Sequence, residues 1–131
     1  MPARTWRGLL AAVLLTSVGG CAGPSDDAAR ATAEAFVDPA AAAADRCDLL
    51  AGPARAALEE DADRPCADAL EAVGVGAGEV ESVAVWGEEA QVRLSDDTLF
   101  LTRTRDGWRV VAGACLARGA GQPYACRLEA S

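Results

Sequence analysis

The sequence predicts an α+β fold in which N-terminal helices pack on an antiparallel meander sheet. In residues 25–78 alanine is abundant, and the larger apolar residues recur at the three- and four-residue spacing of a helix. In residues 79–131 β-branched and aromatic residues take over and are separated by tight-turn sequences. Helices followed by hairpin-linked strands are the usual order of α+β domains, with the helices on one face of the sheet.

Four helices are expected in the alanine-rich half. Ala29, Ala33 and Phe36 share one face of the first helix, and Cys66 and Leu70 share one face of the last. Capping residues, prolines and glycines set the expected ends. The first helix is expected to be capped by Ser25 or Asp26 and to end at Pro39, and the second to be capped by Asp38 and broken at Gly52-Pro53. The third is expected to run from Ala54 to about Glu60. The fourth is expected to open with Pro65 and to end before Gly74.

Five strands are expected after the glycines at 74, 76 and 78. Asp106-Gly107 is the strongest hairpin signal, because glycine tolerates the positive φ that a primed turn requires. The expected strands are residues 80–86, 90–94, 98–104, 108–115 and a short last one around 124–129. Their order predicts a meander of neighbouring antiparallel strands.

The first twenty residues predict a lipoprotein signal peptide. Arg4 and Arg7 precede an apolar stretch at 9–18 that is shorter than the roughly 20 residues a transmembrane helix needs. The sequence Val18-Gly19-Gly20-Cys21 resembles a lipobox, the cleavage and acylation signal of bacterial lipoproteins. Cys21 is therefore the expected lipidation site, and an ordinary secretory leader with a chance cysteine is the alternative.

This cleavage point divides the chain into three segments. Residues 1–20 are the expected signal peptide, 21–25 a lipidated tether and 26–131 the folded domain. A lipidated cysteine carries more than one acyl chain, which is enough for stable anchoring. We therefore expect the protein on the extracytoplasmic face of the cell membrane, with the covalent lipid as its contact to the bilayer.

Composition restricts the chemistry. The chain has no histidine, and its 12 basic residues are all arginine, so neither an imidazole base nor a lysine Schiff base is available. The net charge is −8, which argues against nucleic acid as a partner. Asp61-Ala62-Asp63 lacks the other ligands of a calcium loop and is expected to be a solvated turn. No catalytic residue, metal site or cofactor is assigned.

Four cysteines remain after Cys21, an even number that indicates two disulfides in an exported chain. We favour Cys47–Cys66 and Cys115–Cys126 among the three possible pairings, because this places one bridge in each half. A four-cysteine zinc site and a redox-active thiol pair are the alternatives. Both call for closely spaced cysteine pairs, which the sequence lacks.

Four segments resemble a group of uncharacterised actinobacterial lipoproteins. They are 106–115 and 122–126 around the strand cysteines, and 47–50 and 65–70 around the helix cysteines. Ala114 stands where that group usually has glycine before the strand cysteine, with Gly113 one place earlier. The resemblance implies an NTF2-like (cystatin-like) fold, a cone in which helices cover a curved sheet.

The same resemblance bears on activity. NTF2-like enzymes such as ketosteroid isomerase and scytalone dehydratase use Asp, Tyr or His that line the cone. This chain has no histidine, and its one tyrosine, Tyr124, lies in the tail. No catalytic residue is carried over, and the fold by itself does not indicate a function.

Our leading hypothesis is a non-catalytic domain that binds a small apolar ligand or another envelope protein. Trp86, Phe100 and Trp108 are candidates for lining a pocket, although strand aromatics more often belong to the core. An NTF2-like enzyme that uses a buried carboxylate of raised pKa is the second hypothesis. An accessory subunit with an exposed apolar patch on one sheet face is the third.

Overall fold

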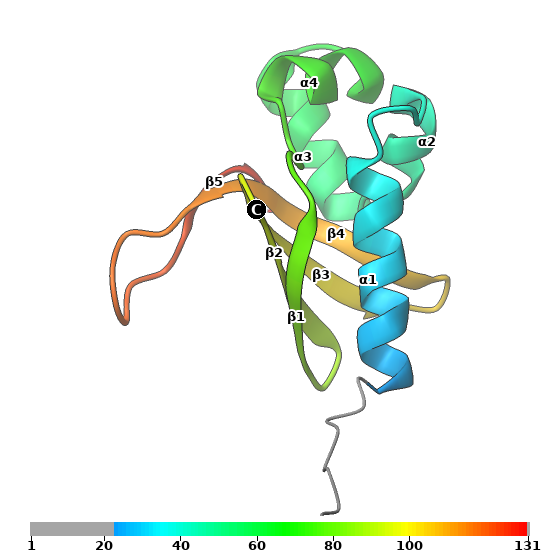
Figure 1. The fold of residues 1–131 in the computed structure, drawn as a ribbon. Coiled ribbons are helices and arrows are strands. Elements are labelled where there is room, and N and C mark those ends of the chain that lie inside the picture. The colour runs from blue at the N-terminus through cyan, green and yellow to red at the C-terminus, as the bar shows by residue number, and fades with distance from the viewer. Residues whose placement is uncertain (1–22, 131) are drawn as a thin grey trace, which may run out of the picture.

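The computed structural model describes residues 23–130 and confirms the α+β class. Four helices precede five strands, and Figure 1 shows the helices and the sheet. The helices are α1 (Pro24–Val37), α2 (Ala43–Asp48), α3 (Gly52–Ala62) and α4 (Cys66–Val73). The strands are β1 (Val80–Trp86), β2 (Glu89–Leu94), β3 (Thr98–Thr104), β4 (Gly107–Leu116) and β5 (Ala125–Glu129).

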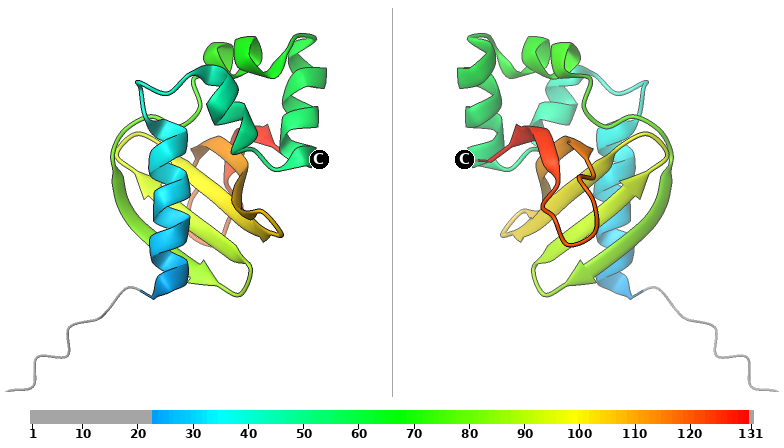
Figure 2. Two further views of the ribbon diagram at one scale, coloured as in Figure 1. Left: turned by 90° about the vertical axis from the view of Figure 1, so that its right-hand side faces the viewer. Right: turned by 90° about the vertical axis from the view of Figure 1, so that its left-hand side faces the viewer.

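The strands form one open antiparallel sheet in the order β1-β2-β3-β4-β5. The long helix α1 lies across one face of this sheet, whereas α2, α3 and α4 gather at one end of the molecule (Figures 1 and 2). The loop between β4 and β5 lies on the face opposite α1 (Figure 2). The meander predicted from the hairpin signals is therefore present.

Two irregularities in strand pairing help the sheet to bend. The register shifts between Val80 and Ser82 in β1, and Val111 is left unpaired because Phe100 pairs with Ala112 while Leu101 pairs with Val110. An extra residue of this kind bends and twists the strand that carries it. Beyond the second bulge, β4 continues as the partner of β5.

The helical end is joined to the sheet through backbone hydrogen bonds. The Val110 N–H donates to the Leu49 carbonyl and the Ala51 N–H donates to the Val110 carbonyl, each at 2.9 Å. The segment between α2 and α3 thus pairs with the edge of β4 next to the part that β5 covers. This pairing fixes the helices to the sheet without a further strand.

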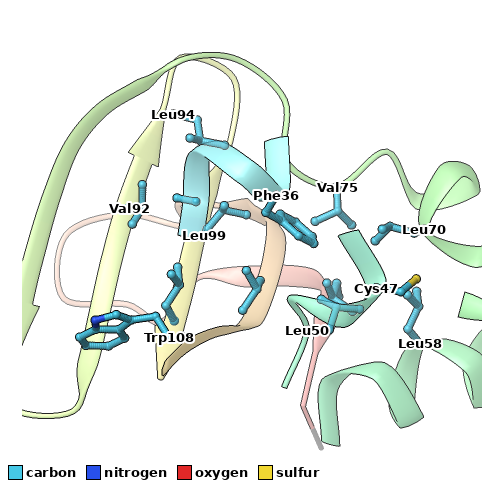
Figure 3. Close-up of a cluster of buried hydrophobic side chains, with 14 of the residues drawn as sticks. Phe36, Cys47, Leu50, Leu58, Leu70, Val75, Val92, Leu94, Leu99 and Trp108 are labelled. Carbon is cyan, nitrogen blue, oxygen red and sulfur yellow. The ribbon is translucent and has the colours of Figure 1, made fainter. Parts of the chain in front are cut away.

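Side chains fill the space between the helices and the sheet (Figure 3). Seven large side chains there are less than 2 % exposed: Phe36, Leu70, Leu99, Leu101, Leu128, Val92 and Val110. They come from the helices α1 and α4 and from the strands β2, β3, β4 and β5. The helices and the sheet therefore share one core. Alanines of α1 face this core as well, which lets the helix approach the sheet closely.

Two expected helix starts were wrong, and both errors concern proline. Asp38 does not cap a helix at Pro39; its carboxylate accepts the Ala40 N–H at 2.8 Å in a turn, and α2 begins at Ala43. Gly52-Pro53 does not break a helix but opens α3, with proline in its first turn. Proline is compatible with both situations, because its missing N–H costs nothing in a first helical turn.

The first helix also begins earlier than expected. Pro24 is its first residue, and the Asp26 carboxylate reaches back to accept the Gly23 N–H at 3.0 Å. Pro24 and Ser25, expected in the tether, therefore belong to α1. The expected lipidation site Cys21 lies outside the described residues. Between residues 23 and 130 no helix combines the length and apolar character needed to cross a bilayer.

Candidate functional site

The three aromatic residues expected to line a pocket do not meet. Trp108 is 4 % exposed and belongs to the core on the helix-facing side of the sheet, where the Arg103 guanidinium lies 4.9 Å from its ring centroid. Phe100 is half-buried and packs edge-to-face on Tyr124, with ring centroids 5.3 Å apart. Trp86, at the end of β1, is 52 % exposed. Trp86, Phe100 and Trp108 therefore do not form a single pocket.

Tyr124 organises the face of the sheet that α1 leaves free. Its hydroxyl accepts a hydrogen bond from Gln91 Nε2 at 3.1 Å, while its ring covers Phe100. Together with Pro123, Cys126 and Glu129, these two rings line an open groove of about 290 Å³. Tyr124 was not expected to belong to a site, because its partners Gln91 and Phe100 lie on strands more than twenty residues away in the sequence.

The carboxylate expected by the enzyme hypothesis is not found between residues 23 and 130. Within that range no Asp or Glu is buried, and the only buried polar side chain is Thr98. Three carboxylates are half-buried: Asp26, Glu59 and Asp97. Each of them accepts a backbone N–H, from Gly23, from Cys66 and from several residues respectively. These carboxylates therefore hold the fold in place through hydrogen bonds from the main chain.

Asp97 makes the most connections of any side chain in this part of the chain. One oxygen, Oδ1, accepts the N–H groups of Thr98 at 2.6 Å and Cys115 at 2.8 Å. The other, Oδ2, accepts those of Gly76 at 3.0 Å and Ala114 at 2.9 Å. Asp97 therefore joins the β2–β3 turn to the end of β4 and to the glycine-rich segment after α4.

The backbone around this junction is tightly constrained. Ala114 has a positive φ of 51°, which is uncommon for a residue with a side chain. A Cβ atom on Gly113 would overlap the side chain of Val75. The glycine at 113 is thus required by close packing, and the bond from Ala114 to Asp97 holds the unusual conformation that follows it.

Arg46 makes a second junction at the helical end. Its Nε donates to the Phe36 carbonyl at 2.6 Å and its Nη2 donates to the Val75 carbonyl at 2.7 Å. Burial lowers the pKa of the Arg46 guanidinium, and the nearby Glu71 carboxylate acts in the opposite direction. Both bonds go to main-chain carbonyls, so Arg46 secures the end of α1. Its Nε and Nη2 donors are therefore used by the fold and not by a substrate.

All four cysteines of residues 23–130 form disulfides. Cys47–Cys66 connects α2 to the first residue of α4, and Cys115–Cys126 connects directly paired residues of β4 and β5. These are the two bridges that the sequence analysis favoured. Within the described range no group of three or more potential ligands could hold a metal ion.

The start of α1 and two hairpin turns lie at the same end of the molecule. Arg103 Nη2 donates to the Ser25 hydroxyl at 2.7 Å, and the Arg103 N–H donates to the Glu88 carbonyl at 2.7 Å. These bonds join the first turn of α1 to β3 and to the β1–β2 turn. In Figures 1 and 2 this end is opposite to α2, α3 and α4. We call it the α1-start end.

No protein-family model matches the chain, and neither a curated protein nor a solved structure is significantly similar to it.

Proposed function

We propose that this chain is a lipid-anchored, extracytoplasmic domain without catalytic activity, which acts by presenting its surface to another envelope protein. The observation that carries this proposal is the filled interior between helices and sheet. Its large side chains, among them Phe36, Leu99 and Leu101, are less than 2 % exposed and pack in one cluster, which supports a domain that acts through its outer surface. We therefore expect a partner to bind to the outer surface of the domain.

Two features support the extracytoplasmic location. The sequence Val18-Gly19-Gly20-Cys21 has the form of a lipobox, and α1 begins only three residues after Cys21. Both disulfides join residues that the fold already brings together, and such bridges persist in oxidising compartments outside the cytoplasm. An anchor and stable disulfides are consistent with one another, because both belong to the outer side of a membrane.

We also propose that the fold is an NTF2-like cone whose interior is packed with side chains, as the resemblance to actinobacterial lipoproteins implies. A bulged antiparallel sheet with a long helix across one face supports this assignment. The Tyr124 and Phe100 groove lies on the opposite face and is open to solvent. If the domain binds a small ligand and not a protein partner, this groove is the proposed binding site.

The charge of the helical end favours a partner with a basic surface. Residues 43–73, which contain α2, α3 and α4, hold eight acidic residues and three arginines. Most of these carboxylates are exposed, and this end lies away from the α1-start end where the anchor would attach. A dense patch of one sign steers association with a surface of the other sign and does so less at high salt.

Processing in the native host tests the anchor. We expect globomycin to block cleavage of the chain, and we expect Cys21→Ser to release the protein from the membrane fraction. A Cys21→Ser protein that stays on the membrane would count against lipidation. Native mass spectrometry of the purified protein tests the filled interior, where the expected mass is that of the chain and its lipid alone.

A further inference from the structure

Trp86 is an exposed aromatic side chain that does not belong to the hydrophobic core. Between residues 23 and 130, Trp86 and Leu116 are the only large apolar side chains that are exposed, at 52 % and 74 %. Trp86 is the last residue of β1 and pairs with Glu89 across a two-residue turn, in which Gly87 has a φ of 63°. The indole is therefore presented on a tight hairpin.

The two exposed side chains lie at opposite ends of the sheet. The Trp86 hairpin belongs to the α1-start end, because the Glu88 carbonyl and the Ser25 hydroxyl are both bonded by Arg103. Leu116 lines a groove with Gly74 and Asp96, beside the last turn of α4 and the β2–β3 turn. Only Trp86 is thus near the point where the described chain begins.

The length of the intervening chain limits how far this end can be from the lipid. Two residues lie between Cys21 and Pro24, and the three steps from one to the other span at most roughly 10 Å when extended. The 14 residues of α1 then rise by about 20 Å away from that start. The α1-start end is consequently within reach of the lipid headgroups, while the acidic helices α2–α4 are farther away.

Charge favours the same orientation. An anionic bilayer surface repels carboxylates over about one Debye length, so that on such a surface an outward position of the acidic residues 43–73 is preferred. Beside Trp86 the exposed carboxylates of Glu88 and Glu89 have to remain in water. The indole can meet the headgroup region while these carboxylates stay hydrated, because tryptophan combines an apolar ring with a polar N–H.

We propose that Trp86 lies in the headgroup region of the bilayer that carries the lipid anchor, and that it orients the domain with α2–α4 pointing away from the membrane. This proposal rests on the lipidation of Cys21 proposed above. It adds a second, weaker contact to the covalent anchor and determines which surface is available to a partner protein.

Tryptophan fluorescence tests the contact directly. After removal of the signal peptide the chain contains two tryptophans, Trp86 and the buried Trp108. The lipidated protein is reconstituted into phosphatidylcholine vesicles with or without brominated acyl chains, and its acylation is verified from its mass. We expect brominated lipid to quench part of the emission and the emission maximum to shift to shorter wavelength on reconstitution. Both changes should disappear in Trp86→Phe.

Leu116→Ala is the matched control, since it removes the other exposed apolar side chain at the far end of the sheet. It should leave the quenching unchanged. The proposal is overturned if acylated protein shows no quenching by brominated lipid while acrylamide in water still quenches Trp86. It is equally overturned if the soluble Cys21→Ser chain already shows the same shift, because a protein contact then covers Trp86. A processed chain without acyl mass instead overturns the proposed anchor itself.

Discussion

The helical end and the sheet are held together by different means, although each contains one disulfide. The helices α2 and α4 have 6 and 8 residues, lengths at which an isolated helix is not stable in water. They are connected to each other through Cys47–Cys66, and the segment that follows α2 makes main-chain bonds to β4. In the sheet, each strand is paired along its length, and Asp97 adds four hydrogen bonds where β4 turns towards β5.

This difference shows how a domain with a small core is stabilised. Short alanine-rich helices bury little apolar area each, so a covalent bridge contributes a large share of the stability of that end. A sheet obtains its order from regular pairing and uses its bridge mainly to fix the last strand. The two disulfides should therefore contribute unequally to the free energy of unfolding.

Removal of Cys47–Cys66 should have the largest effect. The bridge closes a loop of 19 residues, for which the chain-entropy estimate is about 3 kcal/mol. In Cys47→Ala/Cys66→Ala we expect a loss of at least this size in the free energy of unfolding, measured in urea. Amide exchange should increase throughout α2, α3 and α4 while the sheet keeps its protection. Equal loss of protection in both regions would contradict the comparison.

Asp97→Ala should come next, because it leaves four backbone N–H groups without their acceptor. We expect a loss of about 2–3 kcal/mol in the free energy of unfolding. Asp97→Asn keeps one acceptor oxygen and should lose less. The neighbouring Asp96 is exposed, so Asp96→Ala serves as the control and should change stability by about 0.5 kcal/mol or less. Equal effects at 96 and 97 would show that the junction does not stabilise the sheet.

Removal of Cys115–Cys126 should cost less than removal of Cys47–Cys66. The loop closed has 11 residues, and strand pairing together with Asp97 keeps the two segments near each other after reduction. The chain-entropy estimate for this loop is about 2.8 kcal/mol, and we expect a loss of that size or less for Cys115→Ala/Cys126→Ala, with faster amide exchange confined to β5. If this variant proves less stable than Cys47→Ala/Cys66→Ala, the ranking of the two bridges is wrong.

Arg46→Met should have the smallest effect of the series. It removes the two bonds to the Phe36 and Val75 carbonyls but keeps an apolar stem against the Phe36 ring. Hydrogen bonds from charged donors contribute about 1.5–3 kcal/mol each, and partial access of water to the freed carbonyls reduces the loss to about 1–2 kcal/mol in total. Arg55→Met, which removes only exposed ion pairs, is the control and should lose about 0.5 kcal/mol.

Strand positions were predictable from the sequence to a greater degree than helix ends. The ranges of β1 and β3 are those expected, because alternating residues and tight turns are local signals. The start of α2 was not predictable, since Pro39 is compatible with a turn as well as with a first helical turn. For the same reason the sequence predicts a break at Gly52-Pro53, whereas these residues open α3.

The three aromatic candidates do not lie together, for a physical reason that concerns strand faces. Leu99, Phe100 and Leu101 form a continuous apolar run, in which alternation does not show which side faces the helices. The structure buries the two leucines under the helices and places Phe100 on the other face, against Tyr124. Trp108 takes the helix-facing side, so Phe100 and Trp108 are separated by the sheet.

The sequence by itself determined the α+β class, the order of the strands and the supply of cysteines for two bridges, because periodicity, turn residues and cysteine number are properties of neighbouring residues. It also places Cys21 three residues before α1, which underlies the proposed anchor. Only the tertiary structure decided that Asp97 joins three segments, that Trp108 is buried and that Trp86 is exposed at the α1-start end. These outcomes depend on pairing register and bulges between distant strands, which local sequence does not specify.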